Sequence, residues 1–221
     1  MLTNEDYMKL FHETKNSVSL ISSYLQLLEK KYPQISSYDY WFDTTTEVSH
    51  LKSLLSELSQ VKFGENLQLC YTDMRLFLSE LFNHDRTLTG SNEVSFSFDF
   101  GTYPLWTLID PLQFRHAINN IIKNAYESME NEGQISICTY LRKDKVQIDI
   151  SDSGKGLPPE MMDNIFKPFV TNKQNGTGLG LTITKQVIEA HNGDISCSSK
   201  SSTGCTFHIL LPYKSNGGGS L

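Results

Sequence analysis

Residues 110–125 read DPLQFRHAINNIIKNA, and this stretch has the pattern of one amphipathic helix. Asp110 opens the helix, which we expect to continue to about Glu130. Asn120 and Asn124 are four residues apart and therefore lie on one face. Their carboxamide oxygens can bind Mg²⁺ beside a phosphate chain, although two merely exposed asparagines would fit equally well. The apolar face that we expect to enter the core comprises Ile118, Ile121, Ile122 and Ala125.

The run DSGKG at residues 152–156 directly follows a predicted strand. A carboxylate at a strand end, such as that of Asp152, can accept a hydrogen bond from an exocyclic amine. Gly154 and Gly156 allow the backbone to approach a flat ligand closely. Alone, the run also fits an ordinary tight turn.

A second glycine run, GTGLGL at residues 176–181, precedes a helix that we expect over residues 178–191. Free N–H groups and the dipole at a helix N-terminus favour phosphate oxygens. No Gly-Lys-Ser/Thr ends the run, so it is not a P-loop. Between the two runs, Phe166 and Phe169 are expected to anchor a polar, mobile lid that carries Thr171 and Lys173.

In this order and spacing, the motifs resemble the N, G1, F, G2 and G3 boxes of the histidine-kinase and gyrase ATPase superfamily. The last box corresponds to Gly204-x-Thr206. The resemblance implies that ATP and Mg²⁺ are the cofactors, with Asp152 on the adenine amine and Asn124, with Asn120, on the metal. The expected nucleotide contacts also include Gly154, Gly156, Thr171, Lys173, Gly176, Gly178, Leu179, Gly180 and Thr206.

Two N-terminal segments, residues 5–31 and 38–62, each show one apolar seam at heptad spacing, and Pro33 separates them. They predict an antiparallel helical hairpin. Two single-seam helices cannot enclose a core, so we expect a homodimer with a four-helix bundle. The alternative is a hairpin packed on the rest of its own chain. The seam residues are Phe11, Val18, Ile21, Leu25, Leu28, Trp41, Val48, Leu51, Leu55 and Leu58, followed by polar Lys62.

The first segment contains FHETKN at residues 11–16, which resembles the phospho-acceptor box of sensor histidine kinases. The resemblance implies that His12 attacks the γ-phosphate of ATP and that Glu13 fixes the imidazole tautomer. Asn16 would orient a water that dephosphorylates a partner's aspartate. Ser17 replaces the usual proline, which predicts a straighter helix. Glu127 replaces a common phosphate-facing lysine, for which Lys173 and Lys123 can compensate.

The remaining pattern predicts an α+β fold, in which a two-layer α/β sandwich follows the hairpin. We expect domains at residues 1–64 and 65–213, and a disordered tail at 214–221. A helix is expected over residues 73–83, capped by Asp73 or Thr72. Strands are expected over residues 67–70, 94–100, 106–109, 134–141, 145–151, 194–199 and 205–211.

The net charge of −6 argues against nucleic acid or an anionic membrane as the main partner. The sequence shows neither an apolar span of membrane length nor a secretory signal. The four cysteines form no CxxC pair, which favours reduced thiols in the cytoplasm over a zinc site or disulfides. Eleven residues precede His12, so we expect the signal to come from another molecule or from a sensor segment absent from this sequence.

Together these features predict an ATP-dependent protein-histidine kinase of the bacterial cytoplasm, which passes phosphate to the aspartate of a response-regulator receiver domain. A gyrase-type ATPase would need a glutamate at position 120, and a serine-kinase anti-sigma factor lacks the hairpin. A kinase-inactive dimeric scaffold or phosphatase that keeps the pocket is the remaining alternative. Whether the phosphoryl group is transferred to His12 within one subunit or between subunits depends on the handedness of the loop at residues 32–38. The sequence leaves this handedness open.

Overall fold

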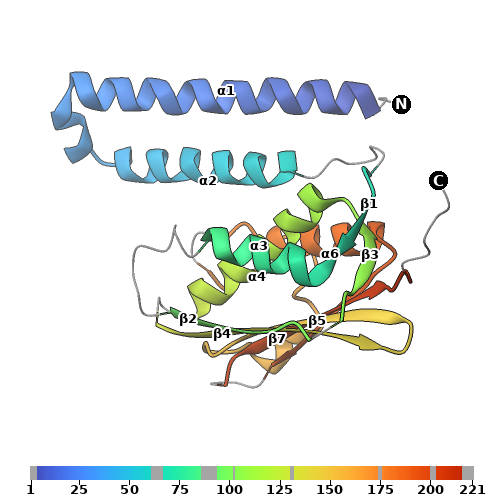
Figure 1. Cartoon of the computed structure of the whole chain (residues 1–221). Helices are drawn as coiled ribbons and strands as arrows, with labels where there is room; N and C mark the ends of the chain where they lie inside the picture. Colours follow the sequence, from blue (N-terminus) through green and yellow to red (C-terminus); the bar gives the residue numbers. More distant parts are fainter. Residues whose placement is uncertain are drawn as a thin grey trace.

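The computed structural model describes residues 4–60, 67–85, 94–101, 103–129, 132–173, 176–199 and 203–215. The side chains of residues 4–12, 53, 56–60 and 83–85 are outside this description. The chain combines two N-terminal helices with an α+β region built on a mixed sheet (Figure 1). The expected domain boundary after residue 64 lies outside the described residues.

The N-terminal helices are α1 (Asn4–Lys31) and α2 (Trp41–Gln60), which lie side by side and run in opposite directions (Figure 1). The short 3₁₀ helix η1 (Pro33–Ser37) connects them. Helix α2 begins three residues later than expected, because residues 38–40 form a further turn, in which Tyr40 has φ 65° and the N–H of Trp41 donates to the carbonyl of Tyr38 at 3.2 Å. Helix α1 is continuous through Ser17, whose hydroxyl donates to the carbonyl oxygen of Glu13 at 2.9 Å.

Neither helix has a buried residue among its described side chains. The seam residues Ile21, Leu28 and Leu51 keep 48%, 40% and 42% of their surface exposed. Helices α1 and α2 therefore contact each other, but their described seam residues do not enclose a core.

The main sheet has the strand order β2-β4-β5-β7-β6. Strands β4 (Gly133–Arg142) and β5 (Lys145–Asp152) form one antiparallel hairpin, and β6 (Asp194–Ser199) and β7 (Cys205–Pro212) form another. Strand β2 (Val94–Asp99) pairs in parallel with β4. The sheet is therefore mixed.

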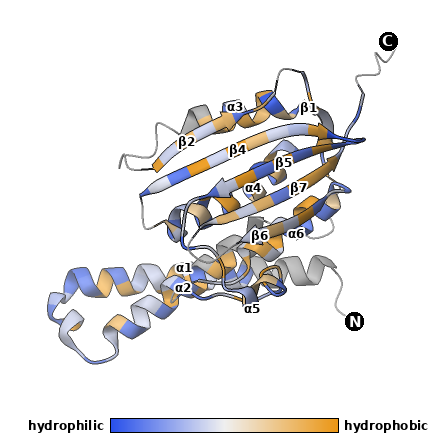
Figure 2. Cartoon of the chain, turned by 90° about the horizontal axis from the view of Figure 1, so that it is seen from below, coloured by the Kyte–Doolittle hydropathy of each residue, from blue (hydrophilic) through white to orange (hydrophobic). Residues whose placement is uncertain are grey.

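Three helices, α3 (Met74–Asp85), α4 (Pro111–Ser128) and α6 (Gly180–Ala190), cover one face of this sheet (Figure 1). Seen from below, the strands lie in front of α4 and α6, and none of the described helices covers this second face (Figure 2). The core lies between the two layers, because apolar side chains alternate along the strands and recur along α4. Its fully buried members include Phe114, Ile118, Ile135, Ile137, Ile148 and Ile150.

A second, two-stranded sheet pairs β1 (Cys70–Asp73) with β3 (Trp106–Ile109). The expected strand at residues 67–70 is thus displaced by three residues. The register with β3 places the strand at residues 70–73, and at its end the Oδ1 of Asp73 accepts the N–H of Arg75 at 3.1 Å and that of Leu105 at 3.1 Å. It therefore caps α3 and ties β1 to the segment that enters β3.

Asp110 caps α4, since its Oδ1 accepts the N–H groups of Leu112 (3.0 Å) and Gln113 (3.2 Å). Its own N–H donates to Nε2 of the buried His191 at 2.8 Å, which connects the start of α4 with the end of α6. At the other end of the region, Lys214 donates to the carbonyl of Trp106 at 2.8 Å. Residues 214 and 215 of the expected tail are thus part of the described structure, and residues 216–221 lie outside it.

Candidate nucleotide-binding site

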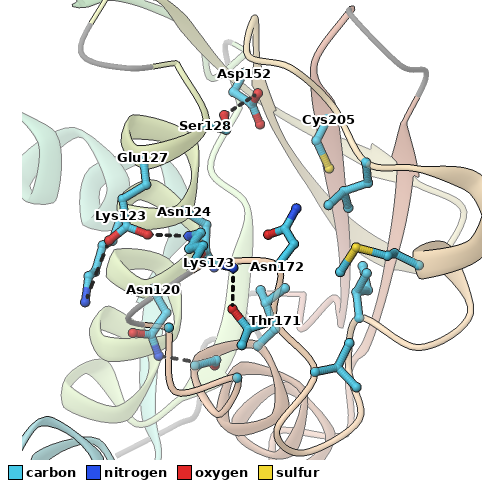
Figure 3. Close-up of a pocket in the computed structure, with 18 of the residues that line it drawn as sticks. Asn120, Lys123, Asn124, Glu127, Ser128, Asp152, Thr171, Asn172, Lys173 and Cys205 are labelled. Atoms are coloured by element: carbon cyan, nitrogen blue, oxygen red, sulfur yellow. Dashed lines mark hydrogen bonds and ion pairs between the residues drawn. The ribbon is translucent and has the colours of Figure 1, made fainter. Parts of the chain in front are cut away.

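A cavity of about 480 Å³ lies between α4, the N-terminus of α6 and the segment after β5 (Figure 3). This volume is in the range of small-molecule sites. Polar groups line two parts of it, and apolar side chains lie between them. The apolar lining is Leu157, Met161, Ile165, Val170, Leu181, Cys205 and Phe207.

Asp152 ends β5 at one end of the cavity and is 8% exposed (Figure 3). Its Oδ1 accepts the N–H of Gly154 at 2.8 Å and the hydroxyl of Ser128 at 3.1 Å. Burial raises the pKa of Asp152, while these bonds and one from the N–H of Cys205 oppose the rise. A carboxylate held in this way can accept a hydrogen bond from an amino group of a flat ligand.

Asn120 and Asn124 point from α4 toward the opposite end of the cavity (Figure 3). The Asn120 amide donates to the carbonyl of Gly180 at 3.3 Å. Lys173 Nζ lies 2.7 Å from Asn124 Oδ1 and also forms an ion pair with Glu127. Lys173, which was expected to reach the phosphates from the lid, therefore contacts Asn124, one of the two expected metal ligands.

This end of the cavity suits a hard cation, because its donors are carboxamide and carboxylate oxygens. The ammonium of Lys173 shows that the arrangement accommodates positive charge there. Among the described residues, no cluster of three His, Cys, Asp or Glu side chains is present. A bound Mg²⁺ would thus complete its shell with water and with phosphate oxygens of the ligand, as this ion commonly does.

Helix α6 begins at Gly180, two residues later than the sequence pattern predicted, and its N-terminus faces the cavity. Gly178 has φ +67°, and a Cβ at this position would lie 2.5 Å from the carbonyl carbon of Phe169. The Gly178 carbonyl also accepts the N–H of Phe169 at 3.0 Å. Glycine is required here because the lid backbone crosses directly over it.

The prediction that two aromatic rings anchor the lid is half wrong. The ring of Phe166 packs edge-on against Phe207, with 6.4 Å between ring centroids. The ring of Phe169 is 73% exposed. The lid is held at this point through the backbone of Phe169, which has φ 64°, rather than through its side chain.

Most of the nucleotide contacts predicted from sequence line this cavity. Two others, Gly154 and Leu179, are neighbours of lining residues; Gly154 contributes the N–H that holds Asp152. The predicted nucleotide contacts that line the cavity are Asn120, Asn124, Asp152, Gly156, Thr171, Lys173, Gly176, Gly178 and Gly180.

Thr206, the remaining predicted nucleotide contact, does not line the cavity. Its hydroxyl lies 2.8 Å from that of Ser151, on the sheet face opposite the core. Because side chains alternate along a strand, the neighbours Cys205 and Phe207 point into the cavity instead.

Sequence reasoning also missed Ser128, which holds Asp152. A usable signal was present, since Ser128 follows Asn124 by four residues on the same helix face.

The predicted acceptor residues His12, Glu13 and Asn16 all lie on α1, and neither Glu13 nor Asn16 lines the cavity. Glu13 and Asn16 are exposed. The side chain of His12 is outside the described part.

Residues 109–215 match the family model described as "Histidine kinase-, DNA gyrase B-, and HSP90-like ATPase". The chain is 30% identical to sporulation kinase A of Bacillus subtilis over 205 residues. This match covers 92% of the chain and 33% of sporulation kinase A. It is also 30% identical over 220 residues to the sensory histidine kinase/phosphatase NtrB of Vibrio alginolyticus, covering 92% of this chain and 60% of that protein.

Solved structures agree on the fold. Full-length ShkA in complex with AMPPNP superposes with a TM-score of 0.75 at 21% identity, over 97% of this chain and 47% of that one. Histidine kinase ThkA in complex with the response regulator TrrA superposes with a TM-score of 0.66 at 21% identity, over 96% of this chain and 62% of that one.

Residues 109–215 therefore form a domain of the histidine kinase, DNA gyrase B and HSP90-like ATPase family, and the cavity lies within this domain. The chain as a whole is homologous to sensor histidine kinases. It spans a third of sporulation kinase A and half of sporulation kinase C. In the described part of the chain, no helix is both long and apolar enough to span a membrane.

Proposed function

We propose that the chain is an ATP-dependent protein-histidine kinase, which phosphorylates His12 and then passes the phosphoryl group to an aspartate of a response-regulator receiver domain. One observation carries the proposal: Asp152 and the Asn120–Asn124 pair lie at opposite ends of one cavity, in a chain that also carries His12-Glu13-x-x-Asn16 on α1 (Figure 3). This spacing suits a nucleotide with its base at Asp152 and its phosphates at the asparagines.

In this proposal Asp152 accepts a hydrogen bond from the adenine amine. Asn120, Asn124 and Glu127 supply oxygens for Mg²⁺, which when bound neutralises phosphate charge. Catalysis then consists mainly of positioning the γ-phosphate in line with a neutral imidazole nitrogen of His12.

On α1, Glu13 accepts the other ring N–H of His12, fixes the tautomer and balances the positive charge that develops during transfer. Asn16 lies one helical turn beyond His12 and is exposed. It is placed to orient a water for dephosphorylation of the receiver aspartate, because an amide can hydrogen-bond a water but cannot replace the histidine nucleophile.

The gyrase type of ATP hydrolysis is disfavoured by position 120. A carboxylate there would activate water, whereas this chain has Asn120, whose amide donates to Gly180. An amide cannot act as a general base. The chemistry of the pocket therefore favours transfer to a protein nucleophile.

The proposed kinase is a homodimer in which residues 1–64 of two copies form a four-helix bundle. The exposed seam residues Ile21, Leu28 and Leu51 support this arrangement, because a second hairpin would bury them. Sedimentation of the whole chain at micromolar concentration tests it. The expected species is a dimer, and a charged substitution, Ile21→Glu, should weaken it. A wild-type monomer would contradict the bundle.

The activity is tested by incubating the chain with Mg²⁺ and ATP labelled in the γ-phosphate. Label bound to the protein should be lost in acid and retained in base, as expected for phosphohistidine. Addition of a receiver domain should then move the label to that protein. ATP binding without any protein-bound label would favour the kinase-inactive scaffold or phosphatase instead.

A further inference from the structure

The sulfur atoms of Cys197 and Cys205 are in contact, with Sγ 2.8 Å from Sγ. Cys197 lies on β6 and Cys205 on β7, which are neighbouring strands. In their register Ser199 pairs with Cys205, so Cys197 is the diagonal neighbour on the same face. A disulfide needs about 2.05 Å between its sulfurs. The two atoms therefore need to approach by less than about 1 Å.

This cysteine pair is connected to the nucleotide pocket. Cys205 lines the cavity, and its backbone N–H forms a hydrogen bond with Asp152. The backbone of the preceding Gly204 passes directly beside Asp152, since a Cβ there would lie 1.8 Å from the carbonyl oxygen of Asp152. Any shift of Cys205 toward Cys197 therefore changes the support of the Asp152 carboxylate.

The two thiols differ in access. Strand β6 is at the edge of the sheet, and Cys197 is half-buried on it. Cys205 is 7% exposed. Its hydrogen bond with Cys197, together with burial, raises the pKa of the Cys205 thiol. Cys197 is thus the thiol that a small oxidant reaches first, and Cys205 is placed to react only with Cys197.

We propose that Cys197 and Cys205 are a modification site, at which a reversible disulfide forms and weakens nucleotide binding. The effect on binding rests on the nucleotide role proposed for the pocket. The absence of a CxxC pair in the sequence favours reduced thiols over disulfides. The fold instead brings together two cysteines eight residues apart, because β6 and β7 form a hairpin.

The oxidant is a low-molecular-weight disulfide such as oxidised glutathione. The thiolate of Cys197 attacks one of its sulfurs, that S–S bond breaks, and one small thiol leaves. Cys205 then loses its proton to solvent and attacks the sulfur of Cys197, which releases the second small thiol. Two protein thiols are oxidised, and one small disulfide is reduced to two thiols.

Linkage requires the converse effect. If the disulfide weakens nucleotide binding by a given factor, bound nucleotide must oppose disulfide formation by the same factor. A nucleotide-loaded pocket should therefore stay reduced at a glutathione ratio that oxidises the empty one.

The test uses the whole chain with Cys70→Ser, which removes the exposed thiol, after equilibration with oxidised and reduced glutathione. Peptide mapping scores the 197–205 link, and ATP affinity is measured separately on the reduced, oxidised and re-reduced protein. We expect a link between these two residues and about tenfold weaker binding, within the usual range of coupling between sites. Re-reduction should restore the affinity. Cys197→Ala should abolish the redox response, whereas Cys138→Ser, on β4, should retain it.

Absence of the link under oxidising glutathione would overturn the modification site. A link that leaves ATP affinity unchanged would overturn its coupling to the pocket. Reduced protein that binds no nucleotide would instead count against the proposed function, since the link is scored independently.

Discussion

Lys173 Nζ donates to Asn124 Oδ1 at 2.7 Å, across 49 residues of sequence, and also pairs with Glu127. An ammonium group thus lies where the proposed account needs a divalent cation. The two cations share ligands, so they compete. Loading of the pocket with Mg²⁺ and nucleotide requires that Lys173 leave Asn124, after which it is free to approach the phosphates.

Replacing Lys173 with Met should lower the Mg²⁺ concentration needed for half-maximal ATP binding by about three- to tenfold, because the competing ammonium is gone. This range corresponds to roughly 0.6–1.4 kcal/mol, as for a partly exposed charged interaction. The measurement is ATP affinity across a Mg²⁺ titration. Lys167→Met, an exposed lid lysine outside the cavity lining, is the matched control. An unchanged Mg²⁺ requirement in Lys173→Met would show that the ammonium does not compete.

Replacing Thr206 with Val should leave ATP affinity within about twofold of wild type, since its hydroxyl bonds to Ser151 on the far side of the sheet. Loss of that hydrogen bond should lower the free energy of unfolding by about 0.5–1.5 kcal/mol. Asp152→Asn is the positive control and should weaken ATP binding at least tenfold relative to GTP. A large loss of affinity in Thr206→Val would restore Thr206 to the binding site.

Stability should fall when the pH drops from 7.5 toward 5.5, in part because of His191. Burial lowers the pKa of His191, although a hydrogen bond to Val187 and the nearby Asp110 oppose the shift. Its Nε2 accepts the N–H of Asp110, so the folded state needs the neutral ring. The unfolded chain therefore binds the proton first, and stability is lost as the pH falls through about 6.5 and toward the lower folded pKa.

Urea unfolding at several pH values measures this effect. His191→Gln should cost about 1–3 kcal/mol at pH 7.5 and should show a shallower loss between pH 7.5 and 5.5. His116, whose pKa burial also lowers, is present in both proteins and so cancels in the comparison. Identical pH slopes would assign the dependence to other groups.

Helix α4 could be predicted from the sequence in nearly full detail, because its signals are local. The Asp110 cap, the isoleucines at helical spacing and the four-residue step from Asn120 to Asn124 all act within one element. The same holds for the strand that delivers Asp152 to the cavity.

Features that depend on pairing between distant segments escaped prediction. Strand β1 pairs with β3 in a separate sheet, and Asp73 binds the backbone before β3, 32 residues away. The Lys173–Glu127 pair and the contact between Cys197 and Cys205 likewise exist only after the sheet and lid are assembled. Thr206 is expected at the site by resemblance alone, whereas the alternation of side chains along β7 places its hydroxyl on the other face of the sheet.

Phosphorylation of His12 by ATP bound in the pocket is tested by comparing wild type with His12→Ala. Both proteins are incubated with Mg²⁺ and labelled ATP, and their ATP affinity is measured in parallel. We expect acid-labile label on wild type only, with equal ATP affinity in the two proteins, because none of the described side chains of α1 lines the cavity. Label retained by His12→Ala would contradict the assignment of the acceptor, and an equal loss of ATP binding would contradict the separation of acceptor and pocket.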